Sequence, residues 1–238
     1  MEIEYILSDF RGMFDFVAVT LSSLHSSLLT LYTAGELSSH ISETSTGSSH
    51  HLCLISGLTK SSSMVMHLKI VTAGPRATGK TTISNFIAGH VDRLDPPETY
   101  SPTFGVRILE FQPTVSGVNE EINVEIWDMS GDQIYESCWK AVIQDADGVI
   151  LVYNPDAPAQ DQQVGDWFEY FVKRHGLRDD QCIVLAHRVN AEGKSGKFRP
   201  PPLFSKVTAA MTTPQSAEDV KSIFENFLKE IHSMKRRK

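Results

Sequence analysis

The most informative pattern in this chain reads Gly74-Pro75-Arg76-Ala77-Thr78-Gly79-Lys80-Thr81. It fits the phosphate-loop pattern G-x-x-x-x-G-K-[ST] at every specified position. Such a loop aims several backbone N–H groups at a polyphosphate, and Gly74 and Gly79 let the backbone wrap where a Cβ would clash. Lys80 is predicted to reach the β- and γ-phosphates, and the Thr81 hydroxyl is predicted to bind Mg²⁺.

The residues on either side of this loop fit a phosphate-binding strand–loop–helix unit. Residues 68–73 read Leu-Lys-Ile-Val-Thr-Ala, a β-branched run that predicts a strand. Beyond the loop, Ile83, Phe86 and Ile87 recur at helical spacing. A helix that begins here turns the positive end of its dipole towards the phosphates. The predicted nucleotide-binding residues of this unit are Gly74, Arg76, Ala77, Thr78, Gly79, Lys80, Thr81 and Thr82.

The composition argues against several classes of protein. The 238 residues carry a formal net charge of −7, which disfavours nucleic acid as the main partner. The three cysteines have neither metal-ligand nor CxxC spacing, which argues against a disulfide framework. No stretch has the apolar length of a membrane span, and residues 234–238 contain no cysteine for prenylation. We therefore expect neither a transmembrane segment nor a lipid anchor.

The chain divides into parts that differ in composition. Residues 1–66 are rich in serine and threonine and low in complexity towards their end, so this extension is predicted to be disordered. Residues 67–234 alternate between strand and helix patterns and are predicted to form the nucleotide-binding domain. Residues 235–238 are predicted to be a basic tail.

Strands and helices alternate through this predicted domain. Residues 107–111 and 122–127 are predicted to pair as a hairpin, and the apolar runs 148–153 and 182–186 suit strands buried on both faces. A last short strand is expected near Val207. Helices are predicted over 136–144, over 164–174 and after Ser216, where Asp219 makes a near capping box; the prolines at 200–202 argue against a helix there. The helical faces that carry Trp139 and Trp167 are either core or interface.

This alternation predicts an α/β fold of the P-loop NTPase type. Its sheet is expected to be mostly parallel, with helices on both faces and right-handed crossovers. Ligands then bind at the carboxyl ends of the strands, where the phosphate loop lies.

Two further stretches are predicted to meet the phosphate loop. Trp127-Asp128-Met129-Ser130-Gly131 ends a strand, so Asp128 is the candidate Walker-B carboxylate for Mg²⁺ and the Gly131 N–H can approach a γ-phosphate. Between the first helix and the second strand, Thr103 is the candidate to close over Mg²⁺ and the γ-phosphate as a switch. The predicted metal ligands are Thr81, Thr103 and Asp128.

In this order and spacing, these motifs resemble a Ras-like small GTPase over residues 67–234. The resemblance can be narrowed to the Rab-like protein five family, whose members are small GTPase subunits of the intraflagellar transport B complex. The similar residues are 101–111, Gly131-Asp132, 136–139, 145–148 and 185–187. The resemblance implies GTP or GDP with Mg²⁺ as ligands and a coiled-coil pair of the core complex as partner. It also implies a role in cilium assembly and transport, with a location in the cilium or flagellum and in the cytoplasm near the basal body.

Some positions depart from the pattern of small GTPases. Asp132 takes the place of the glutamine that orients the attacking water, so GTP hydrolysis is expected to be slow or absent. Arg76 takes the place of a small residue and would either pair with the γ-phosphate or block an incoming arginine. His187-Arg188-Val189-Asn190 stands where N-K-x-D reads guanine, and Asn190 offers one acceptor only, so guanine specificity is left open. The usual S-A-K signature has no clear counterpart near residues 208–210.

The leading interpretation is a guanine-nucleotide-binding switch or scaffold with weak or no GTP hydrolysis. An alternative is a pseudo-GTPase in which nucleotide is a permanent stabilising ligand, as Asp132 and the altered base motif would suit. A P-loop kinase or ATPase is less favoured, because the chain shows no lid insert with clustered arginines. No catalytic residue is assigned, although Arg76 and Asp132 occupy the positions beside the expected γ-phosphate.

Overall fold

The protein is described by a computed structural model that covers residues 3–5, 65–189 and 198–237, all within one of the chain's two compact units. The strands are β1 (Ile3–Tyr5), β2 (Met66–Ala73), β3 (Val106–Phe111), β4 (Ile122–Met129), β5 (Gly148–Tyr153), β6 (Cys182–His187) and β7 (Thr208–Thr212). The α-helices are α1 (Lys80–Ile87), α2 (Glu136–Ile143), α3 (Gln160–Phe168) and α4 (Ala217–Lys235). Shorter helical turns span Gln133–Tyr135, Glu169–Lys173, Asp179–Gln181 and Pro202–Phe204.

These strands form one mostly parallel sheet in the order β1-β3-β4-β2-β5-β6-β7. Strands β4, β2, β5, β6 and β7 run parallel, whereas β3 pairs antiparallel with β4 as the predicted hairpin. β1 was not predicted; it pairs antiparallel with β3 and belongs to the N-terminal extension. Residues 6–64 lie outside the described residues, so disorder of the remaining extension stays a prediction.

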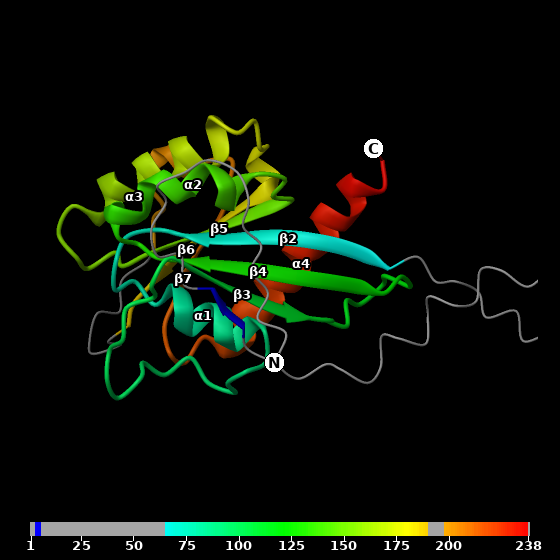
Figure 1. The fold of residues 1–238 in the computed structure, drawn as a ribbon, viewed down its shortest axis with the longest axis horizontal. Helices are drawn as coiled ribbons and strands as arrows, with labels where there is room; N and C mark the ends of the chain where they lie inside the picture. Colours follow the sequence, from blue (N-terminus) through cyan, green and yellow to red (C-terminus); the bar gives the residue numbers. More distant parts are fainter. Residues whose placement is uncertain (1–2, 6–64, 190–197, 238) are drawn as a thin grey trace, which may run out of the picture. The chain divides into compact units, whose positions relative to one another are not determined.

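Helices cover both faces of the sheet, as the α/β prediction required. In Figure 1, α2 and α3 lie on one face, and α1 and α4 lie on the other. One core cluster joins the strands to α2 and α3 through Val142 and Phe168, and a second joins them to α1 and α4 through Phe86 and Phe227. β5 is buried along its whole length because it has helices on both sides.

The helical faces that carry Trp139 and Trp167 belong to the core, because both side chains lie in a buried aromatic cluster. Trp139 of α2 and Trp167 of α3 are both buried, with ring centroids 4.6 Å apart. Phe171 stacks on Trp167 at 5.4 Å, and Tyr170 meets Trp139 edge-on at 5.2 Å. These rings therefore join α2 to α3 as part of the core.

The structure differs from three predicted details in the C-terminal part of the domain. Ser216 is the N-cap residue of α4, as predicted, but its hydroxyl makes no capping hydrogen bond. It accepts instead from the N–H of Thr213 at 3.1 Å, so the expected capping box does not form. A 3₁₀ turn begins at Pro202, where the lack of an N–H costs nothing in a first helical turn. Lys235 is the last residue of α4 rather than part of a free tail, and its Nζ lies 2.7 Å from the carboxylate of Asp147.

Candidate nucleotide-binding site

The phosphate loop lies near the middle of the carboxyl edge of the sheet. It follows β2, which is flanked by β4 and β5, and it leads into α1 at Lys80. The Thr78 hydroxyl donates a hydrogen bond to the carbonyl of Pro75 at 3.1 Å, and the Lys80 ammonium donates to the same carbonyl at 2.6 Å. Both hydrogen bonds lie within the loop, so the Lys80 ammonium is bound by the loop's own backbone.

Lys80 carries its charge in a buried place. Burial lowers the pKa of its ammonium from the usual 10.5 to about 8, and the negative charge of Asp128 opposes this shift. A buried cation that has lost its water is stabilised by any anion that comes within contact distance. A polyphosphate in the loop would supply that anion.

The three predicted metal-binding residues meet beside the loop. The Thr81 hydroxyl donates to Asp128 Oδ2 at 2.8 Å, and it lies 2.8 Å from the hydroxyl of Thr103. Asp128 is fully buried, and its Oδ1 has no hydrogen-bond partner among the described residues. Hydroxyl and carboxylate oxygens suit Mg²⁺, which binds proteins through a few such groups together with phosphate oxygens. The residues present therefore fit a magnesium ion.

Arg107 is a neighbour of Asp128 that the motifs did not indicate. Its Nε lies 3.4 Å from Asp128 Oδ2, and its Nη2 donates to the amide oxygen of Asn85 at 2.6 Å. Burial raises the pKa of the Asp128 carboxyl, whereas the charge of Arg107 and the hydrogen bond from Thr81 lower it. The register of the β3–β4 hairpin places Arg107 opposite Asp128, and this pairing is the feature that could have indicated Arg107.

The D-x-x-G turn packs directly on the phosphate loop. A Cβ on Gly131 would stand 2.5 Å from the carbonyl carbon of Pro75 and 2.6 Å from the backbone nitrogen of Arg76. Only glycine allows this approach, because both neighbours are backbone atoms. One residue on, the Asp132 carboxylate pairs with the Arg76 guanidinium at 3.0 Å.

The predicted base-reading residues occupy different kinds of place. His187 is buried at the end of β6, with Nδ1 3.1 Å from the Thr212 hydroxyl, and burial lowers the pKa of its imidazole to about 4. Arg188 Nε lies 2.9 Å from a carboxylate oxygen of Asp156, and Asn190 lies outside the described residues. Thr212 was missed by the sequence reasoning, although as the last residue of β7 it stands at the carboxyl edge.

The remaining predicted residues fall where the motif put them. Ala77 has a left-handed backbone, with φ of 56°, at the exposed turn of the loop, and Thr82 is half-buried in the first turn of α1. Residues 208–210, where the S-A-K counterpart was sought, lie inside β7. The loop after β7 begins at Thr213.

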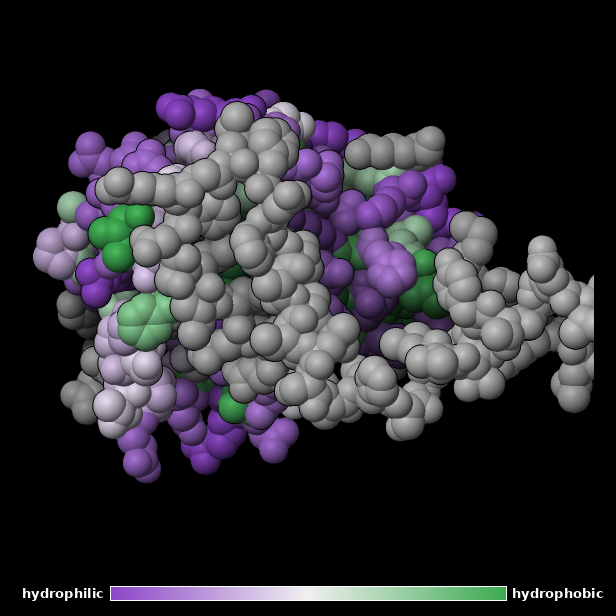
Figure 2. All heavy atoms as spheres, in the orientation of Figure 1, coloured by the Kyte–Doolittle hydropathy of each residue, from purple (hydrophilic) through white to green (hydrophobic). Residues whose placement is uncertain are grey.

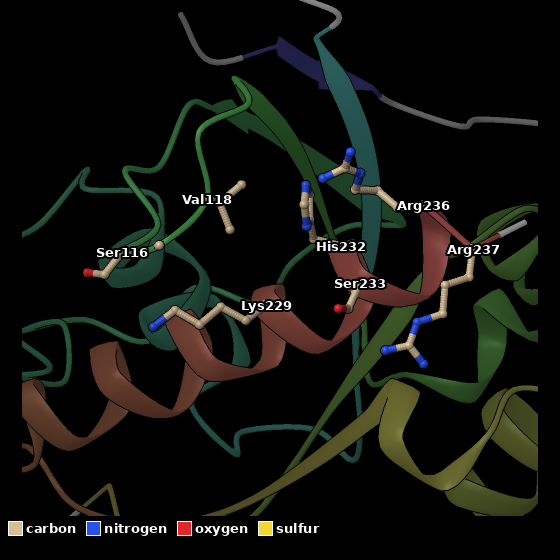
Figure 3. A pocket seen from close by; sticks show the side chains of 8 residues that line it. Ser116, Val118, Lys229, His232, Ser233, Arg236 and Arg237 are labelled. Atoms are coloured by element: carbon tan, nitrogen blue, oxygen red, sulfur yellow. The ribbon is translucent and has the colours of Figure 1, made fainter.

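A pocket of about 510 Å³ lies at the other end of the sheet (Figure 3). It is formed by the β3–β4 turn and the last turns of α4, and its labelled basic side chains point in different directions. Carboxylates pair with several of them: Glu225 contacts Lys229 at 2.9 Å, and Glu120 contacts His232 at 2.9 Å and Arg236 at 3.4 Å. This pocket is separate from the phosphate loop, which follows the far end of β2.

On the face that Figure 2 shows, the visible described residues are mostly hydrophilic. In Figure 2, hydrophobic residues show as separate spots among hydrophilic ones. Two of the most exposed large apolar side chains flank the site: Phe104 follows Thr103 and is 68% exposed, and Ile134 follows the D-x-x-G turn and is 73% exposed. No helix within residues 65–189 and 198–237 is long and apolar enough to cross a bilayer.

A phosphate loop, a threonine that closes on it and a packed D-x-x-G turn at one edge of this sheet define a Ras-like P-loop GTPase domain. The family described as Ras of Complex, Roc, domain of DAPkinase matches residues 69–190. The Homo sapiens intraflagellar transport protein 22 homolog is 36% identical over 172 residues, which are 70% of this chain and 91% of that protein. The chain belongs to this family of intraflagellar transport GTPases, as the sequence resemblance predicted.

Solved structures share the fold. A chain of the GTP-bound T. brucei IFT22/74/81 crystal structure matches with a TM-score of 0.57 and 20% identity, over 72% of this chain and 98% of that one. The GDP-bound T. brucei IFT22 structure matches with a TM-score of 0.53 and 24% identity, over 70% and 97%. These likenesses confirm the small-GTPase-like sheet.

Proposed function

We propose that this chain binds GTP and GDP with Mg²⁺ and serves as a subunit of the intraflagellar transport B complex in cilium assembly and transport. The observation that carries the proposal is the meeting of Thr81, Thr103 and Asp128 at the mouth of a closed phosphate loop with a buried lysine. Relatives of the same family and GTP- and GDP-bound structures of the same fold support it.

Each residue of the site then has a physical role. The Lys80 ammonium would bind the β- and γ-phosphates, and the loop N–H groups would surround them. Thr81, Thr103 and Asp128 would hold Mg²⁺, which neutralises phosphate charge when bound. The Gly131 N–H would approach the γ-phosphate. His187, Arg188 and Asn190 remain the proposed neighbours of the base. His187 would act through the phosphate loop, because its ring packs against Gly79, where a Cβ would stand 2.6 Å from Cδ2.

Hydrolysis of GTP is proposed to be slow or absent. The side chain after the D-x-x-G glycine is the carboxylate of Asp132, which is held by Arg76 and cannot orient water as an amide does. The same observation favours a second candidate, a pseudo-GTPase that keeps its nucleotide as a structural ligand. Two results would favour that candidate: the domain unfolds when its nucleotide is removed, and partner affinity is the same with GDP and with GTP.

The proposed partner is a coiled-coil pair of the core complex, for which counterparts of IFT74 and IFT81 are the candidates. Phe104 and Ile134 are exposed beside residues expected to respond to the γ-phosphate. A partner that covers these side chains would read the nucleotide state. The proposed location is the cilium or flagellum and the basal body region, which imaging of a tagged full-length chain would test.

The Lys80→Ala variant tests nucleotide binding. Removing the buried ammonium should weaken GTP and GDP affinity at least about tenfold, since a charged phosphate contact is lost. Isothermal titration of the full chain with GTP, GDP and ATP in Mg²⁺ measures this and tests guanine specificity. Lys140→Ala is the matched control, because Lys140 is exposed on α2. Equal affinities in Lys80→Ala and parent would refute the site.

A further inference from the structure

We propose that Arg76 determines how strongly this chain prefers a nucleoside triphosphate to a diphosphate, and that Asp132 weakens this preference by competing for the same guanidinium. The inference deepens the proposed function, since it concerns the γ-phosphate end of the same site. It assigns to Arg76 the role of a specificity-determining residue, not of a catalytic one.

Two contacts place Arg76 at that end of the site. The Lys80 ammonium, expected at the β- and γ-phosphates, lies 2.6 Å from the carbonyl oxygen of Pro75, the residue just before Arg76. Gly131, whose N–H is expected to approach the γ-phosphate, packs so closely that a Cβ would stand 2.6 Å from the Arg76 nitrogen. Arg76 therefore leaves the backbone between the two groups that would hold the terminal phosphate.

The ion pair joins a fixed carboxylate to a movable cation. Asp132 is anchored in its own turn, because its Oδ1 accepts from the N–H of Ile134 at 3.2 Å and its N–H donates to the Ser130 hydroxyl at 3.2 Å. Its Oδ2 pairs with Arg76 Nη1 at 3.0 Å, and the two side chains are 26% and 59% exposed. The long, exposed arginine side chain is the member that can turn to another anion.

A γ-phosphate would be that other anion. It carries more negative charge than one carboxylate and offers oxygens for a bidentate contact with a guanidinium. Asp132 both holds the guanidinium back and repels the phosphate, so the two anions compete. A diphosphate has no γ-phosphate, so it competes less with Asp132 for the Arg76 guanidinium. Because both side chains are partly exposed, solvent screens the effect and keeps it small.

The two residues should therefore shift triphosphate affinity in opposite directions. Titration calorimetry of the full chain in Mg²⁺, with GDP and the β,γ-imido analogue of GTP, gives the ratio of the two dissociation constants. Arg76→Gln should reduce the preference for triphosphate by about two- to fivefold, and Asp132→Asn should increase it by a similar factor. Both shifts should shrink as salt is raised.

Controls separate this inference from the proposed function. Arg178→Gln removes the arginine of another exposed arginine–aspartate pair, that with Asp180, and should leave the ratio as in the parent. The inference would be overturned if Arg76→Gln left the ratio of the two dissociation constants unchanged, or if Asp132→Asn lowered the preference for triphosphate. In either case, GDP binding by the same proteins would still support the nucleotide site. A parent chain that binds neither nucleotide would overturn both. Thermal unfolding of each variant checks that the fold is kept.

Discussion

The imidazole of His187 lies directly against Gly79 of the phosphate loop, where a Cβ would stand 2.6 Å from the ring carbon Cδ2. The strand end that was expected to read the base is thus also a support for the loop. Gly79 adopts φ of 85° at the start of α1, so a side chain there would meet both backbone strain and the ring. The hydrogen bond between His187 and Thr212 carries this contact on to β7.

The stability of the chain should depend on the charge of His187. Its folded pKa is lowered to about 4 by burial, so between about pH 6.5 and 4 the unfolded chain binds the extra proton and the folded chain does not. Folding stability is therefore expected to fall as pH drops through this window, by up to about 1.4 kcal/mol per pH unit.

Urea unfolding of the full chain at several pH values, with His187→Asn beside the parent, measures this contribution. The variant should show a shallower fall in the free energy of unfolding below pH 6.5. The difference between the two slopes should vanish above pH 7, which serves as the internal control. Parallel curves throughout would show that His187 does not titrate on unfolding.

The magnesium dependence of nucleotide binding should rest on the two hydroxyls at the loop. Thr81→Ala and Thr103→Ala each remove an oxygen that lies within the cluster around Asp128, so chelation of Mg²⁺ should cost each variant less triphosphate affinity than it costs the parent. Titration with and without EDTA measures the ratio. Thr114→Ala, at an exposed residue after β3, is the control and should behave as the parent. An equal effect of EDTA on all four proteins would contradict the assignment.

Substitution of Gly131 should damage the site through its backbone contact. Gly131→Ala forces a Cβ to within 2.5 Å of the Pro75 carbonyl carbon, so the D-x-x-G turn and the phosphate loop must move apart. We expect a loss of about 1–3 kcal/mol in the free energy of unfolding, together with weaker triphosphate binding. Gly165→Ala is a matched control, since its Cβ would meet a leucine side chain at 3.4 Å. A tolerated Gly131→Ala would show that the two loops are not in fixed contact.

Local patterns were enough for the architecture of the domain. The β-branched and apolar runs predicted β2, β5 and β6, and the spacing of Gly74, Lys80 and Thr81 predicted a loop that leads into a helix. These features depend on neighbours a few residues away, so they can be seen without tertiary contacts. The ends of helices were predicted less well: α3 begins at Gln160 rather than 164, and Ser216 is the predicted N-cap of α4 but its hydroxyl bonds to Thr213 instead of capping the helix.

The sequence by itself therefore determined the fold class, the phosphate loop and the identity of Thr103 and Asp128 as candidates. Only the tertiary structure decided what those residues touch. Arg107 reaches Asp128 through the register of β3 on β4, and Arg76 meets Asp132 because Gly131 lets two loops pack together. The physical reason is that strand order and register bring together residues far apart in the chain, and no local spacing encodes such a contact.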